Sequence, residues 1–153
     1  MIVLKDANYE SNKVEIRSKI INHVYDGEVN KFVIMFIFEF GIQCMQEVGT
    51  IYKENKQSIV NQILWTQDDI NELYNQIKKA CNKSDSCCAW ITLVEPEFEA
   101  LIINGGSTHV ISDYITIFIT IGKGGAGSSI KLTTKKIDLI KWVESIRELT
   151  ISA

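Results

Sequence analysis

The sequence predicts an α+β fold in which an antiparallel sheet of about five to six strands is covered by two amphipathic helices. Between Ile115 and Ile121 every odd position is isoleucine and two of the even positions are threonine, which is the period of a half-buried strand. Such an apolar face must be covered, and aliphatic residues then recur at helical spacing, at Leu139, Ile140, Val143, Ile146 and Leu149. Glycine turns separate the apolar runs, which favours strands joined by hairpins.

Length and composition indicate one globular domain that spans residues 1–153. The chain is 46% hydrophobic and 23% charged, so it can bury a core of its own. The net charge of −3 argues against a nucleic-acid surface and suits a basic protein partner. The first residues are too briefly apolar for a secretory signal, and the longest apolar run, Phe32–Phe38, is too short to span a bilayer. We therefore expect a cytoplasmic protein that binds neither nucleic acid nor membrane.

Strands dominate the first part of the chain. Apolar and charged residues alternate from Lys13 to Ile20, which predicts a strand with one wet face that would suit a sheet edge. After a turn at Asp26-Gly27, a long strand is expected from Lys31 to about Val48. Its first half is apolar on both faces, so we expect a central strand covered on both sides over part of its length. Gly41 and Gly49 are the expected bulge or bend points.

Residues 49–61 indicate no clear element, and a helix follows them. Thr66 is a natural N-cap, with Asp69 at the third helical position as a short capping box and Trp65 and Ile70 placed as a hydrophobic staple. The apolar stripe of this helix is Ile70, Leu73, Tyr74, Ile77 and Cys81. The helix should end near Asn82, where a polar loop begins.

The remaining elements are strands followed by the last helix. Pro96 divides an extended region into two pieces, because proline cannot donate to a strand ladder. The expected order is a strand at Trp90–Val94, a strand at Glu95–Ile103, a turn at Asn104–Gly106, a strand at Val110–Ile121, a loop at Gly122–Ser129 and a strand at Ile130–Thr133. Thr133 or Thr134 is expected to cap the last helix.

Several patterns imitate catalytic or cofactor sites. Gly122–Gly127 matches the dinucleotide-binding spacing of glycines, but a strand pattern follows it where that fold needs a helix, so we interpret it as a hairpin loop. Ser107, or one of the adjacent cysteines Cys87 and Cys88, could be paired with His109, yet these residues are more typical of turn chemistry. The four cysteines lack zinc spacing. We predict no catalytic residue, no cofactor and no metal.

Acidic residues are the strongest candidates for a binding site. Glu97 and Glu99 fall on one face of a strand with their carboxylates about 7 Å apart, close to Glu95. Such a pair could act as acid and base, could be a solvated face, or could attract a cationic partner. Helix-start acids add to this charge, although the helix dipole also explains them. The candidate partner-binding residues are Glu95, Glu97, Glu99, Asp68, Asp69 and Glu72.

The order of elements from Thr66 to Leu149 resembles that of bacterial immunity proteins from contact-dependent and polymorphic toxin systems, in particular the WapI-like group. The resemblance lies in a helix and polar loop, the extended segment Trp90–Phe98, two glycine turns around a returning strand, and a last amphipathic helix. Thr133-Thr134-Lys135-Lys136 stands where that group has an acidic residue. The resemblance implies an inhibitor without catalysis that binds and occludes a cognate toxin domain, often a basic nuclease. The alternatives are a small-molecule or lipid carrier with a cavity beneath Phe32–Phe40, and an unrecognised enzyme.

Overall fold

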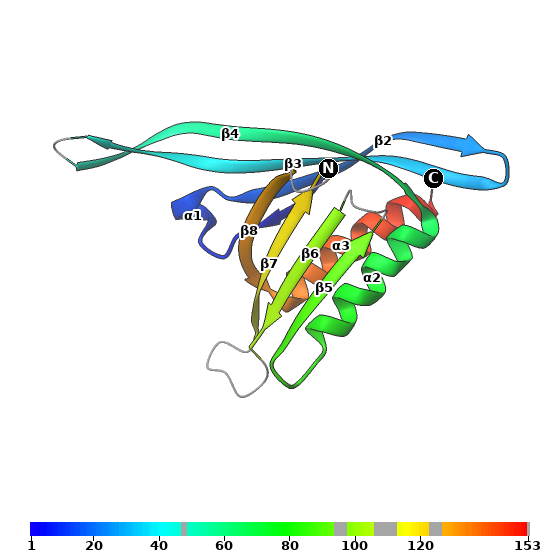
Figure 1. Cartoon of the computed structure of the whole chain (residues 1–153). Helices are drawn as coiled ribbons and strands as arrows, with labels where there is room; N and C mark the ends of the chain where they lie inside the picture. The colour runs from blue at the N-terminus through cyan, green and yellow to red at the C-terminus, as the bar shows by residue number, and fades with distance from the viewer. Residues whose placement is uncertain (47–48, 94–97, 106–112, 123–126, 153) are drawn as a thin grey trace.

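The computed structural model describes residues 1–46, 49–93, 98–105, 113–122 and 127–152 (Figure 1). Within them, two four-stranded antiparallel sheets and three helices confirm the α+β class. The elements are β1 (Ile2–Lys5), α1 (Tyr9–Asn12), β2 (Glu15–Asp26), β3 (Val29–Gln46), β4 (Gly49–Thr66), α2 (Gln67–Cys81), β5 (Cys87–Leu93), β6 (Phe98–Asn104), β7 (Tyr114–Ile121), β8 (Ser128–Lys135) and α3 (Lys136–Ile151).

The first sheet has the strand order β1-β2-β3-β4 and is longer than the rest of the molecule. Its β2–β3 and β3–β4 hairpins extend past the second sheet in opposite directions (Figure 1). Gly27, with φ of 64°, lies in the first turn, as expected, and the pairing of β3 with β4 slips between Gly41 and Ile42, which confirms Gly41 as a bulge point. Gly49 instead starts β4, opposite Gln46.

β4 accounts for the segment that sequence patterns left open. Residues 49–53 and 56–66 pair with β3, so the chain forms more strands than the five or six expected, and they divide into two sheets. β2 lies inside the first sheet over Glu15–Ser18, because β1 pairs with it there. Only the even-numbered face of β3 is fully buried at Phe32, Ile34, Phe36 and Phe38. The odd-numbered side chains from Val33 to Ile37 are half-buried, so the expected cover on both sides is not found there.

The second sheet has the strand order β5-β6-β7-β8, and its buried face turns toward α2 and α3 (Figure 1). One row across this buried face is Ile91, Ala100, Ile119 and Ile130, each paired with the next in register. The alternating burial of β7 confirms the isoleucine period that predicted this strand. The sheet therefore presents its other face outward.

One core holds both sheets and both long helices together. Phe36 of β3 lies 5.6 Å from the Trp65 ring, 6.2 Å from Phe98 and 6.2 Å from Trp142, measured between ring centroids. Trp65 and Phe98 also meet edge to face at 5.1 Å. Because these four rings come from β3, β4, β6 and α3, their packing fixes the two sheets relative to each other.

The two long helices differ in how they begin. The Thr66 hydroxyl accepts from the Asp69 amide, and the Asp69 carboxylate accepts from the Thr66 amide, so the expected capping box of α2 is confirmed. α3 follows β8 directly, and its N-cap Lys135 makes no side-chain cap bond. The prediction that Thr133 or Thr134 caps this helix is wrong, because both residues belong to β8 and Thr134 is buried on its inner face.

Asp6 joins the edge of the first sheet to the edge of the second. Its carboxylate accepts hydrogen bonds from the Asn8 amide at 2.8 Å, the Asn12 side-chain amide at 2.9 Å and the Thr133 amide at 2.8 Å. The Ala7 amide donates to the Thr133 carbonyl at 2.8 Å. The outer edge of β8 is therefore paired at Thr133, and the segment between β1 and β2 is held against it.

Candidate protein-binding face

The outward face of the β5–β8 sheet carries large apolar side chains. The row next to the centre of the sheet pairs Trp90, Leu101, Phe118 and Lys131, and Ile103 lies in the adjacent row. Trp90 is 62% exposed and Ile103 is exposed, while Leu101 and Phe118 are half-buried. We call Trp90, Leu101, Ile103 and Phe118 the Trp90 face. In the described part of the chain, both long helices lie on the opposite side of this sheet (Figure 1).

Strand alternation explains why these side chains point outward. In β5, the side chains of Ile91 and Leu93 point into the core. Trp90 precedes Ile91 directly, so its side chain must point to the opposite face of the sheet. The Trp90 indole N–H donates to the Thr92 hydroxyl at 3.1 Å, which holds the ring over its own strand. The Lys131 ammonium lies 5.6 Å from the Phe118 ring centroid. Each of these two aromatic side chains thus has a contact that orients it on this face.

On β7 and β8, hydroxyl side chains lie on both sides of the row that contains Trp90. Thr116 and Thr133 form a hydroxyl pair at 3.2 Å across β7 and β8, and Thr120 and Ser129 form another at 2.7 Å. These pairs satisfy one another and leave capacity for further hydrogen bonds. An apolar centre with a polar margin is the composition of a protein-binding surface.

Glu99 is the predicted binding residue that lies on this face. It is half-buried on β6, in register with Thr92 and Thr120, one row from Trp90. Glu95 and Glu97 lie outside the described residues. Glu99 therefore places one carboxylate beside the Trp90 face.

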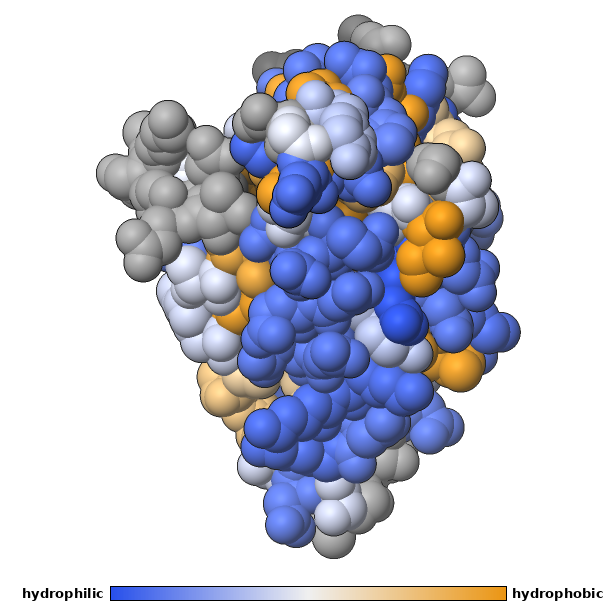
Figure 2. Space-filling view, turned by 90° about the vertical axis from the view of Figure 1, so that its right-hand side faces the viewer, coloured by the Kyte–Doolittle hydropathy of each residue, from blue (hydrophilic) through white to orange (hydrophobic). Residues whose placement is uncertain are grey.

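The other predicted acids lie on α2, in a different layer. Asp68 and Glu72 are exposed, and Glu72 accepts a hydrogen bond from Gln76 at 2.8 Å. The Asp69 carboxylate accepts bonds from the Thr66 amide and hydroxyl, so it has a structural role in the helix cap. The side of the molecule where α2 lies is largely hydrophilic (Figure 2). The structure thus separates the helix acids from Glu99.

The outward face of the β1–β4 sheet is a second open apolar surface. Val60 is 57% exposed and Leu64 is 43% exposed, beside the half-buried odd-numbered side chains of β3. At one end of this face, the Arg17 guanidinium lies 3.1 Å from the Glu15 carboxylate and 3.6 Å from that of Glu39. The hydrogen bond to Glu15 and the charge of Glu39 raise the pKa of Arg17, so its guanidinium stays protonated and links β2 to β3.

The patterns that imitate catalysis have structural explanations where they can be seen. Gly127 lies so close to the Ile121 carbonyl that a Cβ at this position would be 2.5 Å from the oxygen. This steric contact explains why the chain has glycine at position 127. Ser107, His109 and residues 123–126 lie outside the described residues.

The three cysteines whose side chains are described differ in exposure. Cys81, Cys87 and Cys88 are free thiols, the first buried and the last exposed. Burial raises the pKa of the Cys81 thiol to about 11, which keeps it protonated and unreactive at neutral pH. Among the residues whose placement is described, no three His, Cys, Asp or Glu side chains lie close enough to hold a metal ion.

Comparison with protein-family models and with curated proteins finds no match to this chain. Within the described ranges, no helix has both the length and the apolar character needed to cross a membrane.

Sequence reasoning did not single out Trp90. The signal was present, because alternation alone assigns it to the opposite face from Ile91. What the sequence could not show was that the helices would cover only one side of this sheet.

Proposed function

We propose that this chain is a cytoplasmic immunity protein, which binds a cognate bacterial toxin domain with nuclease activity and covers its active site. The observation that carries the proposal is Trp90, which is 62% exposed on the edge strand β5, on a sheet face that no described helix covers. On a protein surface, a large exposed patch of apolar side chains is typical of an interaction site.

The chemistry of the Trp90 face suits a tight protein complex. Tryptophan is enriched among the residues that contribute most of the binding free energy at protein interfaces. Such residues are usually surrounded by contacts that contribute little energy themselves but exclude water. Leu101 is paired with Trp90 on the neighbouring strand, and Ile103 and Phe118 extend the apolar surface on that side of it. Because the tryptophan ring is already held by Thr92, little conformational entropy is lost when a partner covers it.

Charge favours a basic partner. The chain carries a net charge of −3, and Glu99 lies one row from Trp90, whereas Lys131 lies at the far end of the Trp90 row, on β8. A nuclease domain needs a basic surface to hold its nucleic-acid substrate. Attraction between the two proteins would speed their encounter, and seating the Trp90 face over that basic surface would exclude the substrate.

The carrier alternative has less support from the described residues. It needs an open cavity beneath the phenylalanines of β3, but Phe32, Phe36 and Phe38 are almost completely buried. Phe36 contacts the rings of Trp65, Phe98 and Trp142. Described side chains that contact one another in this way favour a packed core at this place over a lipid cavity.

Co-expression tests the proposal. The product of the reading frame next to this gene is expressed in bacteria with and without this chain, and growth and nuclease activity are measured. We expect the partner alone to stop growth, the pair to grow, and the two proteins to co-purify at equal stoichiometry. Failure of both rescue and co-purification contradicts the proposal.

A further inference from the structure

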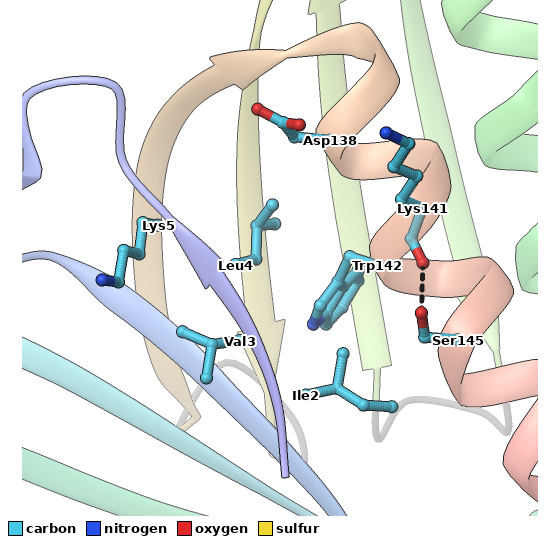
Figure 3. Close-up of a pocket in the computed structure, with 8 residues that line it drawn as sticks. All are labelled: Ile2, Val3, Leu4, Lys5, Asp138, Lys141, Trp142 and Ser145. Carbon is cyan, nitrogen blue, oxygen red and sulfur yellow. Dashed lines mark hydrogen bonds between the residues drawn. The ribbon is translucent and has the colours of Figure 1, made fainter.

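A groove runs between β1 and α3 (Figure 3), and no residue of the Trp90 face lines it. Its volume is about 320 Å³. β1 forms one wall, Asp138, Lys141 and Ser145 of α3 form the other, and Trp142 lies between them. The three helix residues are spaced three and four apart, so they form one stripe along the groove.

The wall formed by β1 is the open edge of the first sheet. The Asp6 amide donates to the Val14 carbonyl at 2.9 Å, so these two residues face each other through backbone hydrogen bonds. In an antiparallel ladder, every second residue of a strand bonds to its partner strand in this way, and the residues between them turn their backbone N–H and C=O groups outward. Leu4 therefore bonds to Ile16 of β2, whereas the N–H and C=O groups of Val3 and Lys5 point away from β2. In the described part of the chain, no strand pairs with this edge. The backbone of Val3 and Lys5 thus offers donors and acceptors to the groove.

The indole of Trp142 adds a buried donor. Trp142 is only 2% exposed, and among the described residues its Nε1 has no hydrogen-bond partner. In Figure 3 this nitrogen is on the side of the ring that faces β1. Ser18 of β2 pairs with Ile2 of β1, and among the described residues its buried hydroxyl also has no hydrogen-bond partner. A buried donor without an acceptor is costly, so an acceptor that enters the groove gains a strong interaction.

The charge around the groove is positive overall. Lys141 forms no ion pair within the described part of the chain, so it is the cation available to an occupant. Lys5 belongs to the opposite wall, but its ammonium lies 4.4 Å from the Tyr9 ring centroid and its side chain points away from α3 (Figure 3). Asp138 is in the first turn of α3, where the partial positive charge of the helix end already offsets a carboxylate. The groove is therefore complementary to an acidic occupant.

We propose that the groove binds an extended acidic segment of a partner polypeptide, which adds a strand to β1. Its main chain pairs with the outward peptide groups of Val3 and Lys5, a carbonyl of the segment accepts from Trp142 Nε1, and an acidic side chain meets Lys141. β1 is four residues long, so the paired segment is of similar length. This site is independent of the Trp90 face and of toxin binding.

Peptide titration tests the proposal without any toxin. The probe is a five-residue peptide of alternating glutamate and valine, blocked at both ends, and the control peptide has lysine in place of glutamate. Binding is followed by NMR of the full chain. We expect saturable shifts of the Val3 and Lys5 amides and of the Trp142 indole N–H with the acidic peptide, and at least tenfold weaker binding of the basic one. Absence of shifts at millimolar peptide, shifts elsewhere only, or equal binding of both peptides overturns the proposal.

Variants separate strand addition from unspecific attraction. Val3→Pro removes a groove-facing N–H that the β1–β2 ladder does not use, so it should weaken binding at least tenfold while the urea midpoint is kept. Lys141→Gln should weaken binding about as much, while Lys79→Gln on the exposed side of α2 should leave it unchanged. Methylating the backbone nitrogens of the peptide should abolish binding without altering the protein. Undiminished binding of the methylated peptide contradicts strand addition.

Discussion

Replacing Asp6 by alanine should destabilise the whole chain, because this carboxylate connects the two sheets. It accepts three hydrogen bonds, from Asn8, Asn12 and the Thr133 amide, at 2.8 to 2.9 Å, and it is only 8% exposed. A hydrogen bond to a charged group contributes about 1.5–3 kcal/mol. Because Asn8 and Asn12 can rehydrate, we count the Thr133 bond in full and the other two at half, which predicts a loss of about 3–6 kcal/mol.

Urea unfolding followed by circular dichroism measures this loss. Asp6→Asn should lower the free energy of unfolding less than Asp6→Ala does, because the asparagine side chain keeps one oxygen that accepts hydrogen bonds. It should still destabilise the chain, because its NH₂ group would face a donor. Asp85→Ala, in the exposed loop after α2, is the matched control and should change stability by less than about 0.5 kcal/mol. Hydrogen exchange should show that the Thr133 amide loses protection in Asp6→Ala. A loss below about 1 kcal/mol, or unchanged Thr133 exchange, refutes the reasoning.

Three further substitutions test the fold. Gly41→Ala should cost about 1–3 kcal/mol in urea unfolding, because its Cβ would lie 2.7 Å from the Asn12 carbonyl; an unchanged midpoint contradicts this contact. Asn104→Ala should cost a similar amount, since the buried Asn104 amide donates to the Ala80 carbonyl at 2.9 Å at the end of α2; a neutral effect refutes that role. For Cys81, burial raises the pKa of the folded thiol from the ordinary 9.0 to about 11, so the thiol of the unfolded chain ionises at a lower pH than that of the folded chain. Stability should fall by up to about 2 kcal/mol from pH 8 to 11, and Cys81→Ala should lose this part of the pH dependence; an identical profile contradicts it.

Local signals in the sequence were sufficient for several elements. The isoleucine period predicted β7 because one face of that strand is buried along its whole length. α2 was predicted in detail because its cap, Thr66 with Asp69, is a contact between residues close in sequence. In each case the information lies within a few residues of the element it specifies.

Contacts between distant residues were harder to predict. β4 contains a polar run, and it forms a strand because β3 supplies a partner along its length. Thr133 looked like a helix cap, but its amide bonds to Asp6, which is 127 positions away in the sequence. Leu149 follows the helical spacing yet is exposed, while Trp142 is buried beside Phe36. Neither result follows from spacing alone, because the position of the sheets decides which helix face is covered.

The candidate site shows the same division. Strand alternation placed Glu99 on an outward face, and the structure has it there beside Trp90. The helix acids were grouped with it by charge, yet α2 lies in another layer. Charge can be counted from the sequence, whereas its distribution over a surface depends on how the layers pack.

The most direct test of the central claim is the affinity of the complex when Trp90 is truncated. Calorimetric titration of the partner with Trp90→Ala should show a dissociation constant about 30- to 900-fold higher, which corresponds to a loss of about 2–4 kcal/mol. Tyr25→Ala is the matched control, because Tyr25 is 69% exposed on the distant tip of the β2–β3 hairpin, and it should change affinity less than about threefold. Equal affinities of the wild type and Trp90→Ala would contradict the claim that this sheet face binds the partner.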